Sequence, residues 1–161
     1  MNDLLHQPGF LGTSANWAAD MTLLLSALVA LLLTVGVVLA VRGQYRAHRW
    51  FQTGASTLNA VLVLWLMVLP YRDFVAAPNN PALLPLSAIA TTRIHAAVGA
   101  LALVFGLFVT LRANKLMPKF LRFSNYKAFM RVAYALYMLA TLIGLFVYIT
   151  WFVGNPSPPS Y

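Results

Sequence analysis

The sequence predicts an all-α fold, a polytopic membrane four-helix bundle with both termini on the outer side. Hydrophobic residues make up 61% of the 161 residues and charged residues only 9%. That balance is far more apolar than an ordinary soluble domain has. Four apolar runs each reach the roughly 20 residues that a helix needs to cross a bilayer. The length predicts a single domain, residues 1–161.

The runs give the expected elements in order, and each is apolar on all sides, as lipid contact requires. They are residues 21–41, 50–69, 92–111 and 129–153. Asp20 precedes the first run, where it can cap the helix. Prolines and an Asn-Asn pair in residues 70–91 predict an irregular outer loop. Tyr148 and Trp151 fit an outer aromatic belt at the end of the fourth run.

Basic residues concentrate in the two other connections, residues 42–49 and 112–128, and just after the second. The chain has 11 lysines and arginines, and this set contains Arg42, Arg46, Arg49, Arg112, Lys115, Lys119, Arg122, Lys127 and Arg131. Cytoplasmic loops of membrane proteins carry this excess of positive charge. We therefore expect a multi-pass protein of the bacterial inner membrane, with both connections in the cytoplasm and both termini in the periplasm. The net charge of +8 then reflects topology, and no nucleic-acid partner is expected.

The residue inventory argues against catalysis. The chain has no cysteine, which excludes disulfides and thiolate chemistry, and only three carboxylates. No zinc-protease, phosphate-loop or serine-elbow motif is present. We therefore expect that the protein is not an enzyme. The first twenty residues lack a basic n-region, so we expect them to stay in the mature chain.

Polar residues follow one face of the second run. His48, Gln52, Ser56 and Asn59 recur at helical spacing. Such a stripe should turn inward and form hydrogen bonds between helices, because polar groups that face lipid are costly. His48 stands in a basic cluster at the inner edge, where we expect a solvated or headgroup-facing side chain.

A second stripe runs down the third apolar run, and it carries a histidine followed by small residues. These are His95, Gly99, Ala102 and Gly106. Such a face can pack closely against a neighbouring helix. It can also leave a flat slot beneath the imidazole for a cofactor, and the sequence leaves both readings open.

Haem and copper are the two candidate cofactors, and the alternative is that the protein binds no cofactor. Membrane bundles hold haem between facing histidines, but the predicted topology puts His48 and His95 on the order of 20–30 Å apart. One iron cannot join them, so His95 would need a second ligand such as Met67 or Met21. Alternatively, imidazole and thioether groups suit Cu(I) at the outer face. The predicted cofactor residues are His95, His48 and Arg93, and the predicted metal ligands are His95, His6 and Met67.

Several segments resemble a family of small four-helix bacterial membrane proteins that carries a domain-of-unknown-function label. They are NDLLHQPGFLGT followed by Asp20, the basic YRAHR, Arg93-Ile94-His95 with Gly99, and FMRVAYALYMLATLIGLFVY. Many members have a histidine in the last cytoplasmic connection, where this chain has Ser124, Asn125 and Tyr126. One member is needed for maturation of haem-copper cytochrome oxidase. The resemblance points to His48 and His95 as the functional residues to test.

The expected function is therefore that of a non-catalytic accessory protein of a respiratory or photosynthetic electron-transfer complex. It would act as an assembly factor or a small subunit of a haem-copper oxidase type complex, with the lipid bilayer and other membrane subunits as partners. A haem- or copper-binding membrane electron carrier is the alternative. A lipid- or quinone-site protein is a third class, for which the sequence offers only Trp65 and the tyrosines.

Overall fold

The computed structural model describes residues 7–76, 86–121 and 124–153, apart from the side chains of residues 69, 70, 73 and 74. Almost all regular structure in this part of the chain is helical. The α-helices are α2 (Trp17–Val41), α3 (Tyr45–Leu62), α4 (Val68–Tyr71), α5 (Leu86–Ala113) and α6 (Tyr126–Tyr148). Between and after them lie the π-helical turns η1 (Val63–Met67), η2 (Arg72–Ala76) and η4 (Ile149–Val153), and the 3-10 turn η3 (Lys119–Leu121).

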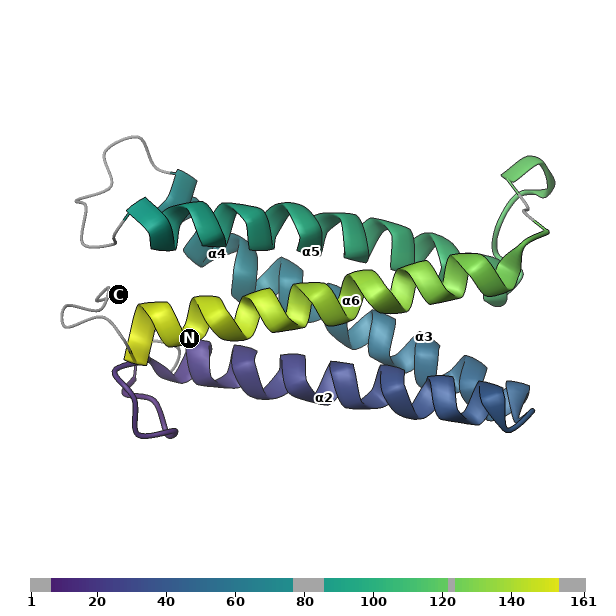
Figure 1. Ribbon diagram of the computed structural model, residues 1–161, viewed down its shortest axis with the longest axis horizontal. Helices are drawn as coiled ribbons and strands as arrows, with labels where there is room; N and C mark the ends of the chain where they lie inside the picture. The colour runs from purple at the N-terminus through teal and green to yellow at the C-terminus, as the bar shows by residue number, and fades with distance from the viewer. Residues whose placement is uncertain (1–6, 77–85, 122–123, 154–161) are drawn as a thin grey trace.

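The helices run up and down in one elongated bundle (Figure 1). α2 packs mainly on α3, and α5 mainly on α6, while contacts of α2 with α6 and of α3 with α5 close the bundle. α2 begins and α6 ends at the same end of the bundle (Figure 1). We call this the capped end, formed by residues 7–16, η2, η4 and the start of α5. The opposite end, formed by residues 42–46 and 113–121 and the start of α6, is the basic end.

Within the part of the chain that the structure describes, three helices are long and apolar enough to cross a membrane: α2, α5, and α6 with η4. Only 17% of the most apolar stretch of each is buried inside the protein, so most of that surface faces outward. Apolar surface of this extent fits contact with a lipid bilayer. The second predicted crossing, residues 50–69, is not among these three, and α3 ends within it, at Leu62. α3 carries the polar stripe and continues through η1, α4 and η2.

The irregular turns around α4 have a local cause in the sequence. Pro70 lacks a backbone N–H and cannot donate to the carbonyl four residues earlier. Helices adapt to such breaks with wider π turns, and η1 and η2 lie on either side of α4. The sequence predicts an irregular loop over residues 70–91. That prediction is wrong for residues 70–76 and 86–91, because helical structure extends to Ala76 and begins again at Leu86.

The helix that follows the N-terminal segment starts before Asp20. Asn16 is its cap, and the Asn16 side chain accepts a hydrogen bond from the Ala19 backbone N–H at 2.8 Å. The prediction that Asp20 caps this helix is wrong. Asp20 lies within the first turn, where its charge still favours the positive end of the helix dipole.

Both helices that end at the basic end stop in the same way. After α2, Gln44 N–H donates to the Leu39 carbonyl at 2.9 Å and Gly43 N–H to Ala40 at 3.1 Å, with Gly43 at φ 76°. This is the hydrogen-bond pattern of a Schellman motif, which needs a left-handed residue. After α5, Lys115 takes the left-handed position at φ 62°, and Leu116 N–H donates to Leu111 at 3.0 Å.

Two apolar clusters hold the bundle together. One lies at mid-length and contains Val29, Leu33, Ala55, Ala102, Tyr137 and Ala140. The other lies at the capped end and contains Ala15, Val75, Ala88, Tyr148, Trp151 and Phe152. Small residues are frequent in both, because close approach of helix backbones replaces bulky packing inside a membrane bundle.

Candidate functional site

His95 is turned toward α6. Its Nδ1 lies 3.1 Å from the Ala140 carbonyl oxygen. The imidazole fits against Gly144, where an added Cβ would come within 2.8 Å of the His95 Cε1. Because a carbonyl can only accept, Nδ1 must carry the proton in this bond, which leaves Nε2 with a free lone pair. This arrangement is the one that metal-binding histidines commonly adopt.

Arg93 lies two residues earlier and points to a different neighbour. Its side chain is exposed, and its guanidinium donates to the Val75 carbonyl in η2 at 3.5 Å. That bond is long, so it positions the start of α5 only weakly. Arg93 therefore leaves most of its hydrogen-bonding capacity at the surface of the capped end.

His48 occupies the opposite part of the bundle. It is buried, and its Nδ1 lies 2.7 Å from the Gly36 carbonyl of α2. The neighbouring Gln52 amide donates to the Leu33 carbonyl at 3.2 Å. Gly36 leaves room for this amide, since an added Cβ would lie 2.6 Å from the Gln52 Nε2. The expectation of a solvated or headgroup-facing His48 is wrong, since the ring joins α3 to α2.

The predicted cofactor residues are not brought to one point. His48 lies three residues into α3 from the basic end, and His95 lies nine residues into α5 from the capped end. At 1.5 Å per residue they are on the order of 20 Å apart along the bundle. A single haem cannot lie between them, so each imidazole would require another ligand at its own depth.

The predicted metal set is only partly described. Met67 ends η1 and is half-buried, while His6 lies outside the described residues. Within residues 7–76, 86–121 and 124–153, no three His, Cys, Asp or Glu side chains are grouped as metal ligands. The copper site of His95, His6 and Met67 stays a prediction.

The inward polar stripe of α3 is confirmed. Ser56 is buried and shares a hydrogen bond of 2.9 Å with Thr110 of α5. Tyr137 of α6 enters this layer through the space above Gly106, and its hydroxyl is adjacent to Ser56 and Asn59. That hydroxyl is buried and makes no well-formed hydrogen bond within the described part of the chain.

The stripe of small residues that follows His95 on α5 is closely packed in one part and open in the other. An added Cβ at Gly106 would lie 2.5 Å from the Tyr137 ring, and Ala102 is fully buried. At Gly99, in contrast, an added Cβ would meet nothing within 4 Å. Close packing therefore holds for the lower half of the stripe, while the surface beside Gly99 is open.

The buried carboxylate of Asp20 organises the capped end. Neither the burial of this side chain nor its binding of the N-terminal segment was predicted from the sequence. The side chain is 0% exposed. One oxygen accepts from the backbone N–H groups of Phe10 at 2.6 Å and Leu11 at 2.7 Å. The other accepts from the Tyr148 hydroxyl at 2.5 Å. Three donors thus replace the water that a carboxylate loses on burial.

The rest of the N-terminal segment is fastened around Asp20. Thr13 shares a 2.8 Å hydrogen bond with Tyr148, and the Ser14 hydroxyl donates to the Phe152 carbonyl at 2.6 Å. The Trp151 indole N–H donates to Thr92 of α5 at 3.1 Å. Tyr148 and Trp151 are both buried, so their predicted place in a lipid-facing aromatic belt is wrong. The available signal was an acid within the first turn of an apolar span, preceded by the Pro8-Gly9 and Gly12-Thr13 turns.

Comparison with known proteins identified no relative of this chain. No family model, curated protein or solved structure matches this chain. The family resemblance drawn from the sequence segments therefore stays a prediction. What the site can do has to be argued from its own chemistry.

Proposed function

We propose that this protein is a non-catalytic accessory subunit or assembly factor of an electron-transfer complex in the bacterial inner membrane, of the haem-copper oxidase type. One observation carries the proposal more than any other: α5 leaves open space at Gly99, one helical turn from His95. An added Cβ at Gly99 would meet no atom within 4 Å. Small residues at a helix surface allow another transmembrane helix to approach closely.

The polar groups next to that surface suit recognition of a partner. His95 holds its Nδ1 proton on the Ala140 carbonyl, so Nε2 is available as an acceptor or ligand. Arg93 lies at the surface of the same end. Together they supply a ligand atom and a cation near the membrane surface. Because the two side chains point to different neighbours, each would receive its own group: a metal ion at His95, and a partner carboxylate or a haem propionate at Arg93.

The interior of the bundle supports a binding role rather than a reaction. His48, Gln52 and Asp20 are each engaged with the main chain of a neighbouring segment. Groups fixed in this way stabilise helix packing. The surface of α5 then remains the part of the molecule through which a partner helix can act.

Two variants on α5 test the proposal directly. Gly99→Leu places a bulky side chain at a position where an added Cβ meets no atom within 4 Å, and His95→Ala removes the imidazole. We expect both to reduce assembly of the oxidase, measured by its haem absorption bands in membranes and by its migration in native gels. Val104→Leu is the matched control, because Val104 is 68% exposed on the same helix. Normal oxidase levels in both test variants would contradict the proposal.

A haem- or copper-binding electron carrier is the second candidate. It is favoured by the geometry of both imidazoles, since each places Nδ1 on a carbonyl, so that Nε2 is the unprotonated nitrogen of the neutral ring. When bound, such a group would supply electron transfer, and His95 or His48 would hold it. An absorption spectrum and metal analysis of the purified protein separate the candidates, because a carrier shows reducible haem bands or stoichiometric copper that His95→Ala or His48→Ala removes.

A further inference from the structure

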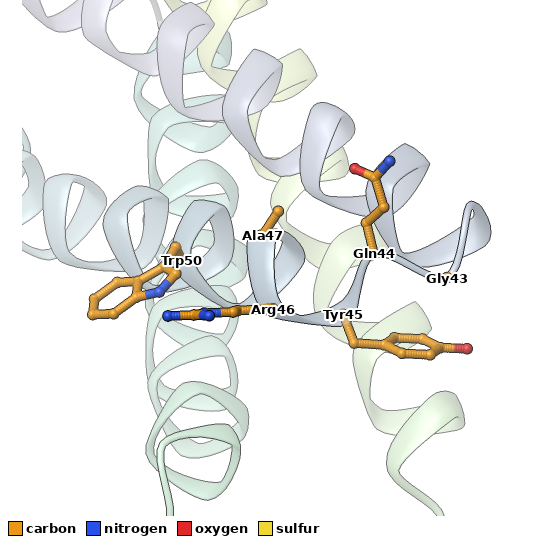
Figure 2. Close-up of a pocket in the computed structure, with 6 residues that line it drawn as sticks. All are labelled: Gly43, Gln44, Tyr45, Arg46, Ala47 and Trp50. Carbon is orange, nitrogen blue, oxygen red and sulfur yellow. The ribbon is translucent and has the colours of Figure 1, made fainter.

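A shallow groove opens at the basic end, where α3 begins (Figure 2). Its volume is about 540 Å³, and it is lined by Gly43, Gln44, Tyr45, Arg46, Ala47 and Trp50. This volume is within the range of pockets that take small ligands. None of these residues belongs to the surface of α5 on which the proposed function rests, so the two proposals stand independently.

Two large aromatic side chains border the groove and are held outward. Tyr45 is 68% exposed and Trp50 is 61% exposed. Rings with one polar atom are typical of the level where a bilayer meets water. The groove therefore lies where lipid headgroups would be, next to the end of an apolar bundle.

Guanidinium groups flank the indole. Figure 2 shows the Arg46 side chain extending along the helix toward Trp50, as residues four positions apart on one helical face do. Arg49 lies with its guanidinium carbon 5.7 Å from the centre of the Trp50 ring, within cation–π distance. The groove thus combines a planar guanidinium, which can form two hydrogen bonds to one phosphate, with aromatic side chains at its border.

Among the residues that the structure describes, no acidic side chain lies at this end. The chain has three acids, Asp3, Asp20 and Asp73. Asp20 is buried at the capped end, in hydrogen bonds with Phe10, Leu11 and Tyr148. The charge-complementary occupant of the groove is therefore an external anion.

Exposed apolar side chains lie close to the groove residues in the chain. Val41 is 83% exposed and Val38 is 42% exposed on α2, and Phe51 is exposed on α3. An acyl chain can lie on these side chains while a phosphate occupies the groove. Neither free phosphate nor an acidic peptide would use both surfaces.

We propose that the groove at the start of α3 binds the phosphate of an anionic phospholipid, with Arg46 as the pairing cation and Tyr45 and Trp50 at headgroup level. The lipid tails extend over Val38, Val41 and Phe51. The site fixes an anionic lipid at one position on the bundle rather than merely attracting the bilayer in general.

Native mass spectrometry of the full-length protein in detergent tests this site. The protein is titrated with phosphatidylglycerol and with phosphatidylcholine of the same acyl chains. We expect phosphatidylglycerol to bind at least about fivefold more tightly, and Arg46→Gln to remove about that factor. Lys127→Gln is the control, because Lys127 is an exposed cation of the same end outside the groove.

Three results would overturn the proposal. Equal loss in Arg46→Gln and Lys127→Gln would show a diffuse charge effect instead of a site. Competition by glycerol phosphate at the lipid's own concentration would show a site for soluble phosphate. A glutamate-rich peptide that binds through Arg46 while phosphatidylglycerol does not would identify an acidic protein segment as the occupant.

Discussion

At the scale of single residues, Asp20 shows how a membrane bundle keeps a carboxylate inside. Its two oxygens accept from Phe10, Leu11 and Tyr148, so the charge is surrounded by fixed donors. Gly9 permits this, because a Cβ there would collide with the Asp20 carboxylate. The consequence is that Asp20, together with the hydrogen bonds of Thr13 and Ser14, attaches residues 7–16 to the helices of the bundle.

Replacing Asp20 should release that segment. In Asp20→Leu the Phe10 and Leu11 amides and the Tyr148 hydroxyl lose their acceptor, which should cost about 3 kcal/mol of unfolding free energy. Hydrogen exchange of the Phe10 and Leu11 amides measures the release, and denaturant unfolding in detergent measures the free energy.

Tyr148→Phe separates the two contributions. It removes one hydroxyl, so we expect a loss of about 1 kcal/mol, with the Phe10 and Leu11 amides still protected. If Asp20→Leu left amide exchange at Phe10 and Leu11 unchanged, Asp20 would not be the group that holds the segment.

At the scale of elements, helix pairing depends on which glycines face a neighbour. Gly106 of α5 receives the ring of Tyr137 from α6, and Gly36 of α2 receives Gln52 from α3. Gly99, two turns before Gly106, meets no atom within 4 Å. The same residue type thus has opposite roles on one helix, as a packing contact and as an open surface.

Alanine substitutions should separate these roles. Gly106→Ala places a Cβ 2.5 Å from a buried tyrosine ring, and we expect it to lower the unfolding free energy by about 1–3 kcal/mol. Gly99→Ala should be neutral or stabilising by up to about 1 kcal/mol, because alanine favours helix. Thermal unfolding of both variants in one detergent checks the difference, and equal effects would argue against the α5–α6 contact at Gly106.

At the scale of the whole molecule, charge distinguishes the two ends. The basic end gathers the described residues Arg42, Arg46, Arg49, Arg112, Lys115, Lys119, Lys127 and Arg131, whereas the capped end carries Arg72, Arg93 and Asp20. Positive charge is retained in the cytoplasm during insertion. We therefore expect the basic end in the cytoplasm and residues 7–16 in the periplasm.

The absence of cysteine from the chain makes this orientation easy to measure. Single variants Leu11→Cys and Leu116→Cys place a thiol at exposed positions of the two ends. In intact spheroplasts a membrane-impermeant maleimide should label Leu11→Cys and leave Leu116→Cys unlabelled until the membrane is permeabilised. The reverse pattern would invert the topology and move the His95 surface to the cytoplasmic side.

The sequence alone predicts a bundle of helices and a stripe from His48 to Asn59 that faces inward, and the described residues confirm both. It also predicts four runs apolar enough for a bilayer, whereas three of the described helices are. These properties are local, because they follow from helical spacing and from the cost of polar groups in lipid. The helix ends were predicted less well, since capping by Asn16 and the π turns around Pro70 depend on backbone geometry.

The partners of the polar side chains depend on how the helices pack, which helical spacing does not reveal. His48 could be solvated or buried, and Tyr148 could face lipid or Asp20, until α2, α3 and α6 were placed side by side. The physical reason is that a hydrogen bond requires two groups within about 3 Å, and residues as far apart as Asp20 and Tyr148 meet only when the helices pack. The same packing closed the space at Gly106 and left it open at Gly99.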